Sequence, residues 1–152
     1  MKDMTLIYVQ DGNKTLFLKR YQKTKDEISV GKYLGVGGKV DKEDKSIEDA
    51  AMREMLEETN LTANNLIKKG TVKFLGQRKY DVTAHVYICT DFDGTLKGDE
   101  REGSLEWVNN DDIDSLNVWE GDRLFLPKLF EDGEFDLTLV YKDGTLVQSK
   151  FL

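Results

Sequence analysis

The sequence predicts one α+β or α/β sandwich domain that spans residues 1–152. Strand-like segments alternate with two helix-like segments, and no repeat, low-complexity tract or linker divides the chain. A length of 152 residues suffices for one well-buried domain and is short for two. Hydrophobic residues at 39% and charged residues at 34% give the ordinary balance of a globular protein.

The chain is expected to open with two strands and a loop. Residues 4–9 and 15–20 have strand-like composition, and the turn-rich residues 11–14 separate them. A polar loop over 21–29 follows. Residues 31–38 then read as a glycine-punctuated strand or loop, in which backbone can approach a ligand closely.

Helix and strand signals continue to the C-terminus. Ser46 is a good N-cap for a first helix, and Pro127 is an irregularity inside a second one. The expected elements are a helix over 47–59, strands over 71–76, 82–90 and 104–108, a helix over 122–131, and a closing hairpin of 135–141 and 145–151.

Charge and cysteine content argue against several classes of protein. A net charge of −7 disfavours nucleic-acid binding, which needs a basic surface, but allows a phosphate substrate if a divalent cation lies between the anions. The apolar runs are too short for a membrane span and no charged-then-apolar leader opens the chain, so we expect a soluble, cytoplasmic protein. Cys89 has no partner for a disulfide, and with His85 as the one histidine a structural zinc site is not expected.

The helix over 47–59 concentrates acidic side chains. At roughly 100° per residue, Glu54, Glu57 and Glu58 share one arc as i, i+3 and i+4 neighbours. Such like charges destabilise a helix by a few tenths of a kcal/mol per pair, and a hard divalent cation would remove that cost. A solvated acidic face is the alternative, and the helix alone leaves both interpretations open.

The same helix has apolar residues on two sides. This distribution predicts a helix that packs on more than one side. The carboxylate side carries Ile47, Ala50 and Ala51, and the opposite side carries Met52, Leu56 and Thr59.

The stretch from Gly38 to Leu61 resembles the Nudix box. That pattern is a glycine, five residues, a glutamate, seven residues, then Arg-Glu-apolar-x-Glu-Glu-x-Gly-apolar. Residues 53–58 match it at every charged position, and Met55 and Leu61 fill apolar positions. So long a pattern is seldom met by chance.

Two departures from the pattern are visible. Asn60 stands where the family has glycine, and asparagine is the next most tolerant residue in a left-handed helix end. The loop before the helix is one residue longer, so Asp44 or Lys45 falls on the glutamate position, depending on the direction of counting. Either the loop bulges so that Glu43 or Asp44 serves, or that role is lost.

Downstream segments extend the resemblance to the MutT/MutX-type 8-oxo-dGTP diphosphatases. These segments are Gly35–Lys39, Glu102–Val108 and Trp119–Asp122. The resemblance implies a Nudix fold, which is an α/β/α sandwich with a mixed β-sheet between helices. It also implies a monomer or homodimer that uses Mg²⁺, with Mn²⁺ as a substitute, to cut purine dNTPs into monophosphate and pyrophosphate.

The resemblance assigns the metal and the catalytic work to acidic residues and one arginine. Arg53 would brace the glutamates through charge-assisted bonds, the alternative being an ordinary surface salt bridge. Glu102 would ligate a metal or act as the base for water, the alternative being an ordinary loop acid. The implied metal ligands are Gly37 through its carbonyl, Glu54, Glu57, Glu58 and Glu102, and the implied catalytic residues are Arg53, Glu54, Glu57 and Glu102.

A second set of residues is implied in substrate binding. Trp119 would stack on the base, although tryptophan is more often core packing, and Asp122 would read the base edge. Leu34 lies where mammalian members place a polar base-reading residue. The full set is Lys19, Tyr33, Leu34, Gly38, Lys39, Trp119 and Asp122.

Two other functions remain as alternatives. One is a Nudix hydrolase for ADP-ribose or a dinucleoside polyphosphate; ADP-ribose members tend to carry a proline after the box, and the one proline here is Pro127. The other is a catalytically idle nucleotide- or protein-binding module, which the extra loop residue and Lys45 would favour.

Overall fold

A mixed β-sheet forms the centre of the computed structural model, which describes residues 1–21, 31–98 and 103–152. Within these residues, eight strands form one sheet in the order β10-β9-β5-β6-β1-β2-β3, with β8 paired to β2. The pairs β1–β6 and β5–β9 are parallel, whereas β1–β2 and β5–β6 are antiparallel. The strands are β1 (Lys2–Asp11), β2 (Lys14–Arg20), β3 (Tyr33–Leu34), β5 (Ile67–Leu75), β6 (Val82–Cys89), β8 (Gly103–Asn109), β9 (Phe135–Lys142) and β10 (Thr145–Phe151).

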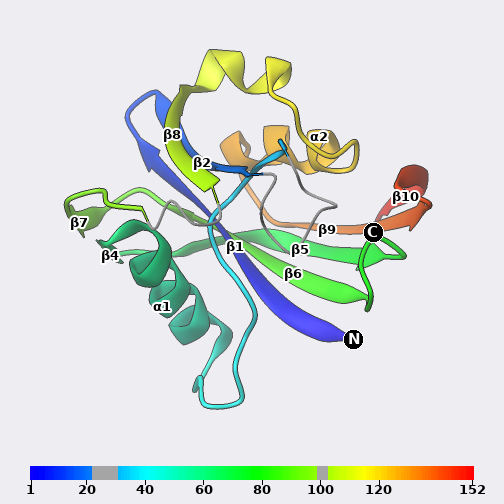
Figure 1. Cartoon of the computed structure of the whole chain (residues 1–152), viewed down its shortest axis with the longest axis horizontal. Helices are drawn as coiled ribbons and strands as arrows, with labels where there is room; N and C mark the ends of the chain where they lie inside the picture. The colour runs from blue at the N-terminus through cyan, green and yellow to red at the C-terminus, as the bar shows by residue number, and fades with distance from the viewer. Residues whose placement is uncertain (22–30, 99–102) are drawn as a thin grey trace.

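Helices cover both faces of this sheet (Figure 1). Strand β1 shows why: Leu6 and Tyr8 belong to one buried cluster and Ile7 and Val9 to another, because alternate residues of a strand point to opposite faces. Helix α1 (Ile47–Thr59) covers the Ile7 face. The other face is covered by η2 (Asn110–Ser115), α2 (Asp122–Phe125) and η3 (Leu126–Phe130). The predicted sandwich is confirmed.

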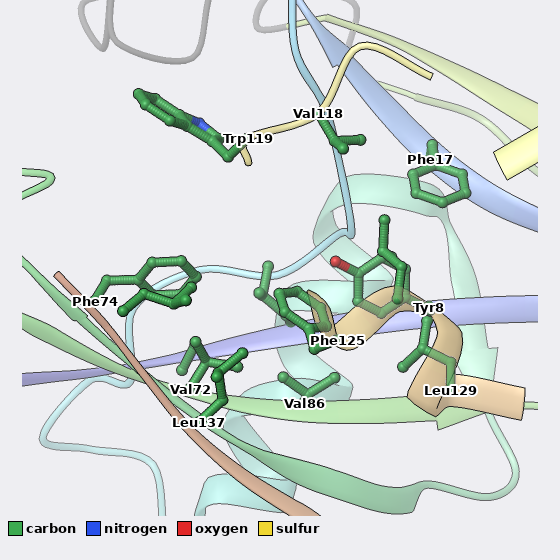
Figure 2. Close-up of a cluster of buried hydrophobic side chains, with 14 of the residues drawn as sticks. Tyr8, Phe17, Val72, Phe74, Val86, Val118, Trp119, Phe125, Leu129 and Leu137 are labelled. Atoms are coloured by element: carbon green, nitrogen blue, oxygen red, sulfur yellow. The ribbon is translucent and has the colours of Figure 1, made fainter. Parts of the chain in front are cut away.

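The cluster that contains Leu6 and Tyr8 lies under α2 (Figure 2). The Tyr8 ring packs edge-on against Phe125, with ring centroids 6.2 Å apart, and Leu129 adds to the same group. Trp119 and Phe74 lie at the border of this cluster (Figure 2). Trp119, which the resemblance links to base recognition, is therefore part of this buried cluster.

Helix α1 begins and ends as its sequence predicts. Ser46 Oγ accepts a hydrogen bond from the Asp49 N–H at 3.0 Å, which satisfies one free donor of the first turn. Asn60 ends the helix in the left-handed conformation, with φ at 64°, and its N–H donates to the Leu56 carbonyl at 2.9 Å. Asparagine thus fills the position where the Nudix pattern has glycine.

The prediction that α1 packs on two sides is wrong. Met52 and Leu56 are 40% and 47% exposed, because the helix lies on the sheet with one face. Small side chains let that face approach the sheet closely. The buried residues are Ala50, Ala51, Met55 and Thr59.

Other departures from the predicted elements are local. The single helix expected over 122–131 is wrong in its form: an α-helical turn ends at Phe125 and a 3₁₀ segment continues, since Pro127 lacks the N–H that α-helical bonding needs. A small sheet of β4 (Leu61–Ala63) and β7 (Phe92–Gly94) was not predicted. Nearly all of the loop expected over 21–29 lies outside the described residues. No helix in the described ranges has the length and apolar character to cross a membrane.

Candidate active site

The glycine segment over 35–39 runs beside β1. The Thr5 N–H donates to the Gly38 carbonyl at 2.8 Å, which fixes the segment along the strand. Gly37 has φ at +143°, and a Cβ there would lie 2.0 Å from the Thr5 carbonyl oxygen. Only glycine fits at this position, so the tight approach of the two backbones depends on it.

The acidic face of α1 rests directly against this glycine backbone. Gly37 donates its N–H to Glu58 Oε2 at 3.0 Å. A Cβ on Gly38 would lie 2.6 Å from the carboxyl carbon of Glu54, so that carboxyl occupies the space that glycine leaves free. Burial raises the pKa of Glu54 above its usual value, although Arg53 partly opposes the shift.

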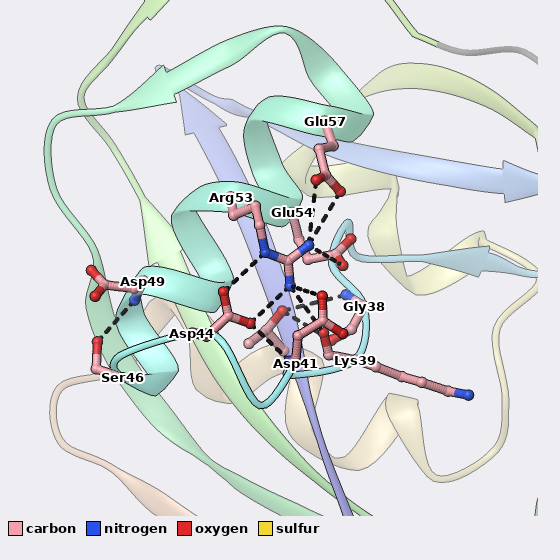
Figure 3. A network of polar contacts seen from close by, with 10 residues as sticks. Gly38, Lys39, Asp41, Asp44, Ser46, Asp49, Arg53, Glu54 and Glu57 are labelled. Carbon is pink, nitrogen blue, oxygen red and sulfur yellow. Dashed lines mark hydrogen bonds and ion pairs between the residues drawn. The ribbon is translucent and has the colours of Figure 1, made fainter.

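Arg53 joins the acidic residues into one network (Figure 3). Its Nη1 lies 3.1 Å from Glu54 Oε1 and 3.3 Å from Glu57 Oε2. Its Nε and Nη2 donate to the two Asp44 oxygens at 3.0 and 2.9 Å, a bidentate geometry typical of strong arginine–carboxylate pairs. Nη2 also donates to the Lys39 carbonyl at 3.3 Å, so Arg53 ties α1 to the glycine segment.

Asp44 is the acid that the longer loop brings to this network. Its side chain is only 9% exposed, and the bonds from Arg53 hold the pKa of its carboxyl below the usual value. Glu43 and Lys45 are exposed. The structure thus places Asp44 of the longer loop against Arg53, and whether Asp44 takes over the role of the family's glutamate stays a prediction.

The donors around α1 suit a hard cation. Glu54, Glu57 and Glu58 supply carboxylate oxygens and Gly37 supplies a carbonyl nearby, which are the ligands that Mg²⁺ prefers. Within the described ranges, no group of three or more His, Cys, Asp or Glu side chains is arranged as a metal site. Metal ligation by these residues therefore stays a prediction, and Glu102 lies outside the described residues.

A pocket of about 430 Å³, measured out to its open mouth, adjoins the glycine segment. Four residues implied by the resemblance line it: Leu34, Gly37, Trp119 and Asp122. Gly37 thus belongs to the pocket wall and also contacts Glu58 of α1. The two predicted parts of the site meet at this one residue.

Trp119 and Asp122 form the buried side of the pocket. Trp119 is 8% exposed and packs edge-on against Tyr141, with ring centroids 5.3 Å apart, so it serves core packing and the pocket wall together. Asp122 is 4% exposed. Burial raises the pKa of Asp122 to about 7, against the opposing pull of Arg78 and Lys32.

Sequence reasoning missed pocket residues at the end of β5 and in the turn that follows. Phe74, Gln77 and Arg78 line the pocket, and Arg78 Nη1 donates to Gln77 Oε1 at 2.6 Å. The Arg78 guanidinium also lies 5.8 Å from the Phe74 ring centroid. The one sequence signal for Gln77 and Arg78 is a loop position after Gly76, which is typical of binding residues but unspecific.

Four predicted substrate residues do not line this pocket, among them Gly38, whose carbonyl accepts the Thr5 N–H. Lys19 is exposed and its Nζ lies 5.6 Å from the Tyr33 ring centroid. Tyr33 lies on β3, which pairs with β2, and it donates its hydroxyl to Glu106 Oε1 on β8 at 3.3 Å. Lys39 is exposed, with its Nζ 5.6 Å from the Tyr80 ring centroid. Contacts of these residues with phosphate or base stay predictions.

Comparisons with known proteins identify the family. The family model for the NUDIX domain matches residues 3–129. A relative from Danio rerio named oxidized purine nucleoside triphosphate hydrolase is 32% identical over 137 residues, which cover 88% of this chain and 83% of that protein. The protein of the same name from Mus musculus is 32% identical over 124 residues, 80% and 78% of the two chains.

Solved structures agree on the fold. A MutT protein from Bacillus halodurans superimposes with a TM-score of 0.87 at 24% identity, covering 99% of this chain and 97% of that one. A MutT NUDIX hydrolase from Burkholderia pseudomallei has a TM-score of 0.72 at 22% identity, covering 84% and 97%. Because the family model covers most of the sequence and the two vertebrate relatives exceed 30% identity, the chain belongs to the Nudix family of hydrolases.

Proposed function

We propose that this chain is a Mg²⁺-dependent pyrophosphohydrolase of oxidised purine deoxynucleoside triphosphates such as 8-oxo-dGTP, with the monophosphate and pyrophosphate as products. The observation that carries the proposal is the double role of Gly37, which lines the pocket and donates its N–H to Glu58. The two relatives named oxidized purine nucleoside triphosphate hydrolase support the substrate class.

The proposal places the base in the pocket and the polyphosphate along α1. A chain of phosphates that left the pocket past Gly37 would pass close to Glu58 and Glu54, with Glu57 on the same arc of α1. These carboxylates and the Gly37 carbonyl would hold the cation. A divalent cation there would neutralise the polyphosphate and polarise a phosphoryl oxygen.

The chain's own residues position the acids and handle the proton. Arg53 holds Glu54 and Glu57 at fixed distances, and Asp44 fixes the guanidinium in turn, so the carboxylates need little reorganisation. A carboxylate, from Glu102 or α1, would take the proton of the attacking water. Attack in line on phosphorus then expels the bridging oxygen with the pyrophosphate.

A substrate panel tests this function. Pyrophosphate release is measured with Mg²⁺, with Mn²⁺ and with excess chelator, on 8-oxo-dGTP, dGTP and dATP, and AMP release is measured on ADP-ribose. We expect metal-dependent pyrophosphate release from at least one purine triphosphate. Cleavage of ADP-ribose with no pyrophosphate from any triphosphate would contradict the proposal, and nucleotide binding without any cleavage would favour the idle module.

The setting of the enzyme is also a proposal. We propose that it acts on free nucleotides in the cytoplasm, which agrees with a lone cysteine, Cys89, buried in β6. Burial raises the pKa of the Cys89 thiol and so lowers its reactivity. Whether the protein is a monomer or a homodimer is measured directly by light scattering during size exclusion.

A further inference from the structure

Two residues that line the pocket, Gln77 and Asp122, each bury a polar atom that has no hydrogen-bond partner among the described residues. Gln77 is 8% exposed and Asp122 is 4% exposed. In the part of the chain that the structure describes, neither Gln77 Nε2 nor Asp122 Oδ1 has a hydrogen-bond partner. A buried polar atom left in this way is costly, so a site that holds two of them is suited to a ligand that satisfies both.

The orientation of the Gln77 amide follows from Arg78. A guanidinium has donors and no acceptor, so the oxygen of the amide must face it. Arg78 Nη1 donates to Gln77 Oε1 at 2.6 Å, which leaves the amide NH₂ as the group available to a ligand. Arg78 is itself placed against the Phe74 ring, 5.8 Å from its centroid.

We propose that Gln77 is a specificity-determining residue that donates a hydrogen bond from Nε2 to an acceptor atom of the purine base, and that Arg78 is its positioning residue. The inference rests on the proposed function and adds a base contact to it. Asp122 lines the same pocket, and its buried Oδ1 would take a donor of the same base. The ligand is therefore a base edge that offers an acceptor beside a donor.

Both purines can present such an edge. Guanine and its oxidised form offer O6 beside N1–H, and adenine offers N1 beside its exocyclic amine. Guanine and adenine therefore share one acceptor and one donor on the same edge. Binding measured with analogues of both bases shows which of the two the pocket takes.

The chain contains a matched control for this test. Gln10, at the end of β1, also has an amide nitrogen without a partner among the described residues, but it does not line the pocket. Gln77→Glu replaces the amide donor with an oxygen while it keeps the size of the side chain and the acceptor for Arg78. Gln10→Glu makes the same chemical change away from the pocket.

Affinity is measured by calorimetry with Mg²⁺ for non-hydrolysable analogues of dGTP, 8-oxo-dGTP and dATP, and for inorganic tripolyphosphate, which has no base. We expect Gln77→Glu to weaken binding of at least one purine analogue by about tenfold or more, because a buried acceptor of the base loses its donor. Binding of tripolyphosphate should change less than about twofold, and Gln10→Glu should match the wild type for every ligand. A loss confined to guanine analogues assigns O6 as the acceptor, and a loss confined to the adenine analogue assigns N1.

Two outcomes overturn the inference. One is a Gln77→Glu variant that binds every purine analogue like the wild type; the other is an equal loss for tripolyphosphate, which would make Gln77 a general structural residue. Arg78→Met tests the positioning role. If that variant binds the purine analogues with wild-type affinity, Arg78 does not position Gln77. If the wild type binds purines through Gln77 but releases no pyrophosphate, the proposed reaction fails while this inference stands.

Discussion

Helix α1 and the pocket differ in whether their polar groups have partners in the protein. On α1, Arg53 contacts Asp44, Glu54 and Glu57, so the positive guanidinium lies beside these acids before any substrate binds. In the pocket, Gln77 and Asp122 each bury an atom with no partner among the described residues. The difference teaches that the end proposed to hold the phosphates is organised in advance, whereas the end proposed to hold the base would be completed by what binds to it.

Removal of one carboxylate from the organised end should have the largest effect. Glu57→Gln keeps the size of a side chain that is 58% exposed and removes its charge. We expect kcat to fall by at least about 10³-fold, because the cation loses a ligand, with the unfolding free energy within about 0.5 kcal/mol of wild type. Pyrophosphate release and urea unfolding measure the two quantities.

The control for Glu57→Gln is Glu43→Gln. Glu43 is an exposed acid on the loop before α1. Its variant should keep the wild-type kcat. An unchanged kcat in Glu57→Gln would remove Glu57 from the catalytic machinery and leave α1 as an acidic surface.

The next largest effect is expected at the arginine that organises the acids. Arg53→Lys keeps a positive charge but cannot reproduce the bidentate bond to Asp44 together with the contact to Glu54. We expect kcat to fall about 10²-fold through misplaced carboxylates, and the unfolding free energy to fall by about 1–2 kcal/mol. Steady-state kinetics and urea unfolding measure both.

Arg123→Lys separates the two effects. Arg123 donates to the Asp114 and Leu116 carbonyls at 2.8 and 2.6 Å, outside the site, so its variant should lose stability while it keeps kcat. If Arg53→Lys shows the same pattern, the network is a scaffold and plays no part in positioning the acids.

The acidic side of α1 is also the part of the site that the sequence predicts well. Glu54, Glu57 and Glu58 lie within two helical turns, so their shared arc follows from helix periodicity alone. The cap at Ser46 and the left-handed Asn60 follow from local chemistry in the same way. What periodicity could not give was the exposure of Met52, which depends on the sheet beneath the helix.

The pocket could not be predicted to the same degree because the fold assembles it from separate segments. Leu34, Gln77 and Trp119 come from three parts of the chain that meet only once the sheet has formed. The resemblance supplied Leu34, Trp119 and Asp122, but nothing in the sequence linked Gln77 or Arg78 to them. Long-range strand pairing, such as β5 with β9, decides these contacts and leaves no local pattern.

The protonation of Asp122 in the pocket should make the free energy of unfolding depend on pH, an effect of intermediate size. Asp122 keeps its proton up to a pKa of about 7 in the folded protein, compared with 3.8 as its ordinary value. Between these values the folded state binds one more proton than the unfolded state, so stability falls as the pH rises from about 4 to 7 and is constant above. Asp122→Asn removes this loss.

Relative to the wild type, Asp122→Asn should therefore gain on the order of 2 kcal/mol in unfolding free energy between pH 5 and pH 8. Urea unfolding at the two pH values measures it. Asp111→Asn, an exposed acid in η2, should track the wild type at both. Parallel pH curves for Asp122→Asn and the wild type would mean that Asp122 is ionised in the folded protein throughout this range.

The smallest effect is expected where the glycine segment meets the organised end. In Gly38→Ala the new Cβ would lie 2.6 Å from the Glu54 carboxyl carbon, and the flexible end of that side chain can move aside, so the fold should change little in stability. We expect kcat to fall about tenfold, because a displaced Glu54 no longer matches the geometry that Arg53 sets. Gly37→Ala is the contrasting variant, since its Cβ would meet the Thr5 backbone at 2.0 Å and should cost stability instead. A Gly38→Ala enzyme with full kcat would show that Glu54 does not need the space that Gly38 leaves free for its carboxyl. The evidence that the acids of α1 are organised before substrate binds would then rest on Glu57 and Arg53 alone.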